Sequence, residues 1–256
     1  MKRIVIKLVN KLGYNITKRR KSVMTKNLSL FKTKTGNYYL PSDANNDIIA
    51  LTIKRNKIFD ENIYNVAKDF IKLGSTVLDV GSNFGQMAVL FSDLTGETGT
   101  IYAFEAADFV FDILTKNILA NKRNNIISTF GAVHNVSNEF LFFPEPDFNK
   151  FDSYGSFGID YINRKGRKVP TITIDSLNIQ EPISFMKIDI QGGDLYAMQG
   201  AINTISKNKM PILFEYEYLF ENQMSHNFQD YVDFVNTINY KFVKVIDGQN
   251  YLILPK

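Results

Sequence analysis

From residue 59 onward, hydrophobic positions along the chain follow two alternating patterns. Short apolar runs bounded by Gly, Pro, Asn or Asp are typical of buried strands, and longer segments with apolar residues every three or four positions are typical of helices. The expected strands cover residues 76–81, 99–106, 125–133, 168–175, 184–190 and 211–217, and the expected helices cover 61–73, 84–94, 108–122, 194–208 and 227–238. This alternation predicts a doubly wound α/β fold, a mostly parallel sheet covered on both faces.

Two segments of the body depart from the alternation. Residues 137–168 are aromatic with scattered Gly, Asp and Asn, and we expect a β-rich insertion there, with one strand over 139–144. The last apolar runs, 240–247 and 250–255, flank Asp247-Gly248, a tight-turn pair. They predict a C-terminal hairpin that adds an antiparallel strand near an edge of the sheet. The body is expected to span residues 43–256.

The charge distribution separates residues 1–42 from this body. Residues 1–42 carry eleven Lys or Arg and no acid, whereas the remainder has 19 basic and 26 acidic residues. Within the arm, Ile4, Val5, Leu8, Val9 and Leu12 form an apolar stripe beside a basic row, which is typical of a helix at a membrane surface. The alternative is a solvated helix packed on the body. No apolar run reaches the roughly 20 residues of a membrane span and no cleavable signal peptide is recognisable, so we expect a cytoplasmic protein, peripheral at the inner membrane face.

Residue types missing from the chain narrow its chemistry. There is no cysteine, which excludes disulfides, thiol nucleophiles and thiolate metal sites. There are two histidines, so a multi-histidine metal site is disfavoured, and no spacing of the acids requires a metal. We therefore expect no metal.

The segment "STVLDVGSNFG" carries the main chemical signal, because a strand, a glycine turn and a helix in this order form a nucleotide site. A dinucleotide fold needs a glycine where Asn83 stands, and Asp79 would repel a pyrophosphate. Asp79, Gly81 and Gly85 instead suit S-adenosylmethionine, a cationic ligand without phosphate, and Asp79 would face its ammonium or sulfonium end. Glu105 ends the next strand, where a carboxylate can accept both ribose hydroxyls. The alternative for the glycines alone is an ordinary strand–helix turn.

Five motifs in order, "VLDVGSNFGQMAVLF", "IYAFEA", "TITIDSL", "FMKIDIQGGDLYAMQGA" and "ILFEYE", resemble FkbM-type methyltransferases over about residues 59–217. The resemblance implies the class I, Rossmann-like methyltransferase fold, dependence on S-adenosylmethionine and O-methylation of sugar or other secondary-metabolite hydroxyls. It implies that the cofactor is held by Asp79, Gly81, Asn83, Gly85 and Glu105, to which we add Ala106 and Ala132 at the ends of the second and third expected strands.

The resemblance also bears on the acceptor side. It implies that Asp189 lies beside the transferable methyl group, and Glu61 matches an acid that the family often carries. The sequence departs from the family at Gln191, where a glutamate is usual, and Asp194 stands where a second glutamate is common. Gln191 keeps the hydrogen-bonding capacity and loses the charge, so a role as base or metal ligand is in doubt here.

An alcohol acceptor must lose its proton, and the candidate bases are Asp189 in the expected strand 184–190, Glu215 in the expected strand 211–217, and His134 after the expected strand 125–133. We assign catalysis to Asp189, Glu215 and Gln191, and acceptor contact to Glu61, Lys187 and His226. The alternatives are a capping role for Asp189, a sheet-covering role for Lys187, a solvated Glu217 and a structural His134.

The acceptor class follows from the insertion, whose aromatic, Asp and Asn side chains suit a carbohydrate but also suit a loop packed on a sheet. We expect an O-methyltransferase that acts on a sugar, glycan or glycolipid-type hydroxyl. A methyltransferase-like binding module without turnover is the main rival. A nucleic-acid methyltransferase that uses the basic arm is disfavoured by the acidic body, and a nicotinamide oxidoreductase is disfavoured by Asn83 and Asp79.

Overall fold

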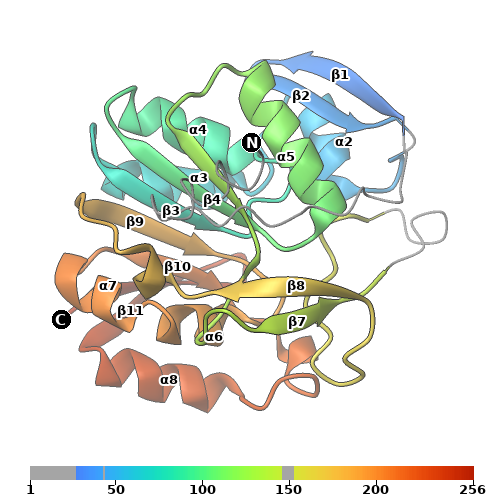
Figure 1. Cartoon of the computed structure of the whole chain (residues 1–256). Helices are drawn as coiled ribbons and strands as arrows, with labels where there is room; N and C mark the ends of the chain where they lie inside the picture. The colour runs from blue at the N-terminus through green and yellow to red at the C-terminus, as the bar shows by residue number, and fades with distance from the viewer. Residues whose placement is uncertain (1–26, 43, 146–152) are drawn as a thin grey trace, which may run out of the picture.

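The computed structural model describes residues 27–42, 44–145 and 153–256, and a seven-stranded sheet in the order β11-β12-β10-β9-β3-β4-β5 runs through it (Figure 1). The strands are β3 (Thr76–Val80), β4 (Thr100–Glu105), β5 (Ile126–Phe130), β9 (Ile183–Ile188), β10 (Ile212–Glu215), β11 (Tyr240–Ile246) and β12 (Asn250–Pro255). Neighbours from β5 to β10 are parallel, and β12 is antiparallel to β10 and β11. The expected doubly wound class is confirmed, as is the antiparallel strand near one edge.

Helices cover both faces of this sheet and create two hydrophobic cores (Figure 1). One face carries α3 (Glu61–Phe70), α4 (Gln86–Thr95) and α5 (Asp108–Ala120), and the other carries α6 (Asp194–Gln199), α7 (Ile202–Asn208) and α8 (Phe228–Thr237). Successive side chains of a strand point to opposite faces, so Val77 belongs to the first core and Leu78 to the second. This explains why the central strands read as continuous apolar runs.

A hairpin before the expected body corrects the predicted domain boundary. β1 (Leu28–Thr33) and β2 (Gly36–Pro41) pair along their whole length and pack beside α5. Tyr38 and Leu40 are fully buried, and the backbone N–H of Tyr39 donates to Asn117 Oδ1 at 2.6 Å. The body therefore includes residues from Leu28 onward, and a start near residue 43 is too late. The expected amphipathic helix lies outside the described residues.

A small second sheet lies beside the large one. It joins β6 (Ala132–Val133), β7 (Phe140–Phe143) and β8 (Arg167–Ile172) in the order β6-β8-β7. Within residues 137–168 the described part forms the strand β7, the first residues of β8 and connecting backbone, so it is poorer in strand than the aromatic composition indicated. The remaining elements are α2 (Ile48–Lys54) and the short 3₁₀ helices η1 (Ile174–Leu177) and η2 (Tyr218–Phe220).

The order of the sheet reverses between β3 and β9, because the chain adds β4 and β5 on one side of β3 and returns to the other side for β9. The ends of these two strands meet closely, since the backbone N–H of Asp189 donates to the Val80 carbonyl at 3.0 Å. A Cβ on Gly81 would lie 1.9 Å from the Asp189 carbonyl oxygen, so only glycine fits there. Ligands of open α/β sheets bind at such a reversal.

Candidate active site

A cavity of about 340 Å³ opens at the carboxyl ends of β3, β4, β9 and β10. Of the expected site residues, eight cofactor or catalytic candidates and one acceptor candidate line it, among them Gly81, Asn83, Glu105, Ala106, Ala132, Lys187, Asp189 and Gln191. Glu215 lines it as well. The fold therefore brings together residues that are up to 134 positions apart in the chain, as the parallel sheet predicted.

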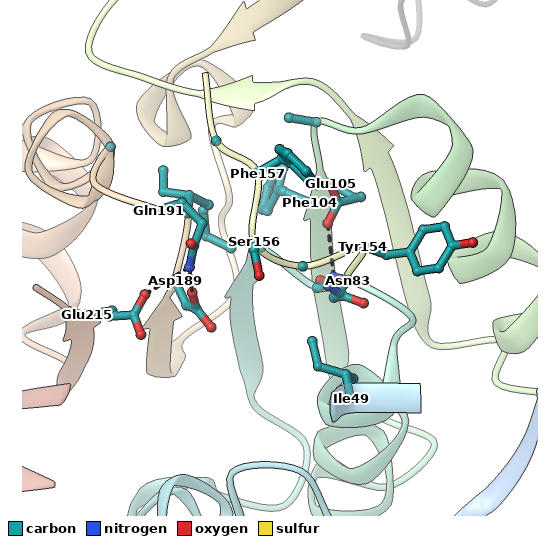
Figure 2. A pocket seen from close by; sticks show the side chains of 18 of the residues that line it. Ile49, Asn83, Phe104, Glu105, Tyr154, Ser156, Phe157, Asp189, Gln191 and Glu215 are labelled. Carbon is teal, nitrogen blue, oxygen red and sulfur yellow. Dashed lines mark hydrogen bonds between the residues drawn. The ribbon is translucent and has the colours of Figure 1, made fainter. Parts of the chain in front are cut away.

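On one side of the cavity, Glu105 ties the glycine turn to the end of β4. Its Oε2 accepts from the backbone N–H of Asn83 at 3.0 Å, and its Oε1 accepts from the backbone N–H of Ala107 at 2.8 Å (Figure 2). Burial raises the pKa of Glu105 to about 7, against the lowering effect of these backbone hydrogen bonds. The carboxylate keeps further lone pairs for the ribose hydroxyls that a nucleoside would present.

The turn between β3 and α4 has three residues with positive φ: Gly81 (φ 82°), Asn83 (φ 48°) and Gly85 (φ 87°). Gly81 and Asn83 line the cavity, whereas Gly85 does not. A Cβ on Gly85 would lie 2.5 Å from Leu114 Cδ1, so this glycine allows α4 and α5 to pack closely. Gly85 therefore has a role in packing, and its expected contact with the cofactor stays a prediction.

Asp79 differs most from expectation, because it does not line the cavity. Asp79 and Lys187 are register partners on neighbouring strands, so both side chains point to the same face of the sheet. Asp79 is fully buried, neither carboxylate oxygen has a hydrogen-bond partner among the described residues, and its Oδ1 lies 4.0 Å from Lys187 Nζ. Burial raises the pKa of Asp79, and Lys187 opposes that rise. The geometry therefore supports an ion pair with Lys187, and Asp79 lies behind the residues that line the cavity.

Lys187 connects this buried acid to the cavity. Its Nζ lies 3.3 Å from Asp189 Oδ2 and 3.5 Å from the Gly81 carbonyl oxygen. Burial alone would lower the pKa of Lys187, but Asp189, Asp79 and Asp60 raise it above the ordinary value. The lysine is therefore a buried cation. Burial alone would raise the pKa of Asp189, but Lys187 holds it below its ordinary value, so Asp189 is ionised.

Asp189, Gln191 and Glu215 form a network on the opposite side from Glu105 (Figure 2). Gln191 has positive φ (56°), and its Nε2 donates to Glu215 Oε2 at 3.1 Å and to Asp189 Oδ1 at 3.4 Å. Burial, followed by the charge of Asp189, raises the pKa of Glu215 to about 10. The Gln191 amide therefore donates to the ionised Asp189 and to the neutral Glu215. A glutamate at position 191 could donate a hydrogen bond to either of them only if its own carboxyl group were protonated.

Further acids surround this network. Six of the described lining residues are acidic and Lys187 is the single lysine or arginine among them. Burial raises the pKa of Asp60 to about 6, and the like charges of Asp189 and Asp247 add to the rise. The fully buried Asp194 accepts from the Glu215 backbone N–H at 3.2 Å, and burial followed by Asp189 raises its pKa to about 8. Asp194 thus supports the network from outside the cavity.

Two acceptor candidates lie elsewhere. Glu61 is the exposed first residue of α3, and the neighbouring Asp60 lines the cavity in its place. His226 Nε2 lies 3.2 Å from the Gly192 carbonyl oxygen, and its ring meets Tyr196 edge-on at 4.9 Å. The expected contact of Glu61 and His226 with the acceptor therefore has no support in the geometry. His134 packs on Tyr196 at 4.7 Å and also lies away from the cavity, in agreement with a structural role.

Several residues that line the cavity were not among the site candidates predicted from the sequence. Residues 153–159 cross the cavity, Ile48 and Ile49 of α2 contribute an apolar wall, and Asp247, Gln249 and Asn250 reach it from the terminal hairpin. An aspartate that directly precedes a helix, as Asp60 does, was a usable signal. The contribution of α2 had none, because nothing in its sequence separates a cavity wall from an ordinary amphipathic helix.

Two classes of site have no support in the described part of the chain. No group of three or more His, Asp or Glu there is arranged to hold a metal ion. Within residues 27–42, 44–145 and 153–256, no helix has the length and hydrophobicity required to cross a membrane.

Comparison with known families and structures complements this geometry. The model of the methyltransferase FkbM domain matches residues 79–242, which span the glycine turn, the Asp189–Gln191–Glu215 network and the start of β11. The fibrillarin model matches residues 9–135, slightly less than half of the chain. No curated protein matches the sequence significantly.

Solved structures are similar only at low identity. A protein described as an rRNA methylase from Clostridium thermocellum shares 13% identity with a TM-score of 0.49, over 76% of this chain and 93% of that one. A methyltransferase FkbM from Methylobacillus flagellatus KT shares 16% with a TM-score of 0.45, over 70% and 43%. Fibrillarin of Methanococcus jannaschii shares 15% with a TM-score of 0.45, over 92% and 85%. At these values the structural likenesses carry no argument about the acceptor.

Proposed function

The chain belongs to the FkbM family of S-adenosylmethionine-dependent methyltransferases, and from this premise we propose that it methylates a hydroxyl of a sugar, glycan or glycolipid-type acceptor. The observation that carries the proposal is the position of the Asp189 carboxyl group in the cavity wall, held by Lys187 and Gln191 at the end of β9 beside the turn between β3 and α4. Bound S-adenosylmethionine supplies an activated methyl group on a sulfonium.

The residues around Glu105 fit this cofactor. Glu105 offers a carboxylate at the end of β4 for the ribose hydroxyls, and Gly81 lines the cavity while it lets the turn pack closely against the Asp189 backbone. Ala106 and Ala132 add small apolar side chains where an adenine needs a flat surface. Asp60, Asp189 and Glu217 bring negative charge to the opposite side, which suits a cationic amino-acid end.

Asp189 receives the proton of the acceptor hydroxyl. A hydroxyl whose oxygen gains a methyl group becomes strongly acidic, so a carboxylate with a lowered pKa would be basic enough to take its proton. Gln191 orients Asp189 by hydrogen bonding and has no charge to lose. Glu215, whose pKa is raised to about 10, is neutral at pH 7 and can donate a hydrogen bond to a second acceptor hydroxyl.

The charge of the cavity favours a polyhydroxyl acceptor over a phosphodiester. Asp60, Asp189, Glu217 and Asp247 surround the acceptor side, and Lys187 is already paired with Asp189. Carboxylates accept hydrogen bonds from sugar hydroxyls and repel phosphate oxygens. Nucleic acid is therefore disfavoured as the acceptor in this proposal.

Transfer of a tritiated methyl group tests the proposal. The protein would be incubated with labelled S-adenosylmethionine and, separately, with neutral glycosides, glycolipids and RNA. We expect label in an alkali-stable sugar ether, and a loss of about 100-fold or more in kcat for Asp189→Asn. Asp233→Asn on the exposed side of α8 is the matched control and should keep full activity. Label in RNA would contradict the acceptor class, and cofactor binding with no labelled product would favour the inactive module.

The location in the cell is a separate proposal. Residues 1–26 contain the amphipathic pattern and nine of the eleven basic residues of the arm, and we propose that they hold the enzyme at an anionic, cytoplasmic membrane face. Sedimentation with vesicles that contain 30% anionic lipid should retain the full chain at low salt and release it at high salt. Equal retention of a chain that lacks residues 1–26 would contradict this.

A further inference from the structure

Residues 153–159, here called the strap, run across the cavity between its two sides. All seven residues of the strap line the cavity. Figure 2 shows the strap with Tyr154, Ser156 and Phe157, passing between Asn83 and Glu105 on one side and Asp189 and Gln191 on the other. Whatever occupies the cavity must therefore contact the strap or displace it.

Two glycines let the strap lie close to both sides. A Cβ on Gly155 would lie 2.8 Å from Asn83 Nδ2 and 2.8 Å from Ile49 Cδ1. A Cβ on Gly158 would lie 2.8 Å from the Gln191 carbonyl oxygen and 3.0 Å from Gln191 Cβ. The strap thus contacts Asn83 of the turn between β3 and α4 near its own start, and the Gln191 backbone near its own end. The position of the strap is therefore coupled to both sides of the cavity.

One buried carboxylate holds the strap to α2. Asp47 Oδ1 accepts from the backbone N–H of Ala50 at 2.6 Å and caps α2. Its Oδ2 accepts from the backbone N–H of Tyr154, 107 residues away, at 2.7 Å. Asp47 is fully buried, and the Tyr154 ring packs between Phe84 at 5.9 Å and Phe109 at 5.7 Å. Both short bonds to a carboxylate are of the stronger, charge-assisted kind.

We propose that Asp47 is a positioning residue for the cofactor: it fixes α2 and the strap to each other, so that the two walls they contribute close over the nucleotide. The identity of the ligand rests on the proposed function. The two hydrogen bonds by which Asp47 joins α2 to the strap, here called the clasp, rest on the contacts of Asp47 alone. α2 supplies Ile48 and Ile49 to the cavity wall, and the strap supplies Tyr154 to Ile159. One carboxylate therefore sets the relative position of two walls that no continuous secondary structure connects.

Hydrogen exchange of the full chain, with and without S-adenosylhomocysteine, tests this proposal. In Asp47→Asn one of the two carboxylate acceptors becomes an NH₂ donor, so one of the two backbone bonds is lost. We expect the strap amides to exchange about tenfold faster or more, and the Kd for S-adenosylhomocysteine in calorimetry to rise about tenfold. The loss of protection by S-adenosylhomocysteine should be confined to the strap and α2.

Two further variants separate clasping from capping and from folding. Asp47→Ser keeps a cap acceptor for Ala50 and cannot reach Tyr154 as well, so α2 exchange should stay near the wild-type rate while strap exchange rises. Gly158→Ala leaves Asp47 intact and pushes the strap from Gln191, so it should raise the Kd in the same direction. Asn227→Ala removes the capping box of the distant α8 and should change neither quantity.

The outcomes are decisive for the clasp. Unchanged strap exchange in Asp47→Asn, or faster exchange with an unchanged Kd, would overturn it. An equal rise in strap exchange in Asn227→Ala would show a loss of general stability and would also overturn it. If the wild type binds no S-adenosylhomocysteine, the proposed function fails, whereas exchange without ligand still decides whether Asp47 holds the strap.

Discussion

Gln191 is the position where this chain departs from the usual family glutamate, and the substitution Gln191→Glu tests why. Gln191 Nε2 is the shared donor to Glu215 Oε2 at 3.1 Å and Asp189 Oδ1 at 3.4 Å. Replacing the amide by a carboxylate removes both hydrogen bonds and adds a like charge beside the ionised Asp189. We expect the variant to fold with lower stability, because three carboxyl groups then share one region.

The magnitude follows from the two lost bonds. A hydrogen bond to a charged group contributes about 1.5–3 kcal/mol, and the length and partial exposure of these two reduce each to about 1 kcal/mol. A loss of about 2 kcal/mol at pH 8 corresponds to a fall in Tm of about 4–8 °C for a chain of this size. Burial and the charge of Asp189 raise the pKa of the introduced carboxyl group above its value in the unfolded chain. The stabilisation that its protonated form gives is therefore complete below the unfolded pKa and is lost as the pH rises through the folded pKa.

Thermal and urea unfolding at pH 5.5 and pH 8.0 measure this effect. At pH 5.5 the introduced carboxyl is partly protonated and can donate again, so the loss should be roughly half of that at pH 8. Gln191→Ala removes the donor without adding charge and should be destabilised equally at both pH values. Gln180→Glu, on an exposed amide that donates to the neighbouring Asn178, should lie within about 0.5 kcal/mol of wild type. A Gln191→Glu variant as stable as wild type at pH 8 would refute the reasoning.

Three further predictions follow from individual groups. Gly81→Ala places a Cβ 1.9 Å from the Asp189 carbonyl oxygen at φ 82°, so it should lose about 3 kcal/mol or more in urea unfolding and bind no cofactor; near-native stability would contradict the geometry. Ionised Glu105 is the better acceptor for ribose hydroxyls, and its pKa of about 7 implies a Kd for S-adenosylhomocysteine about tenfold higher at pH 6 than at pH 8. That dependence should vanish in Glu105→Gln, and a flat wild-type profile would contradict it. The pKa of Asp194 is raised to about 8, so the stabilisation that its protonated form gives is complete below pH 3.8 and is lost as the pH rises through 8. The Tm should therefore fall less between pH 6 and pH 9 in Asp194→Asn than in wild type. Parallel curves of Tm against pH would refute this.

Much of the fold was readable from the sequence because its signals are local. Buried parallel strands appear as continuous apolar runs, and a glycine directly after such a run, as Gly81 is, predicts a turn that needs positive φ. The hairpin of β1 and β2 was missed because its burial depends on α5, almost eighty residues away: Asn117 bonds the Tyr39 backbone in both directions. The prediction of an arm over residues 1–42 rested on their basic charge, and the apolar residues of the hairpin within that range were not given weight.

The candidate site was predicted in part for the same reason. Residues at strand ends, such as Glu105 and Asp189, were found because parallel strands align their carboxyl ends. Asp79 was assigned to the cofactor since its sequence position adjoins the turn, but its register with Lys187 turns it into a buried ion pair. Asp47 and the strap were missed as partners, because a hydrogen bond across 107 residues leaves no periodic pattern in either segment.

Calorimetric titration of the purified chain with S-adenosylmethionine, alongside NAD, tests the central claim most directly. The account predicts micromolar binding of S-adenosylmethionine, no binding of NAD, and an affinity at least tenfold lower for Glu105→Ala, because the ribose then loses its carboxylate acceptor. The absence of binding at millimolar S-adenosylmethionine, or equal affinity of wild type and Glu105→Ala, would contradict a cofactor site at the ends of β3 and β4.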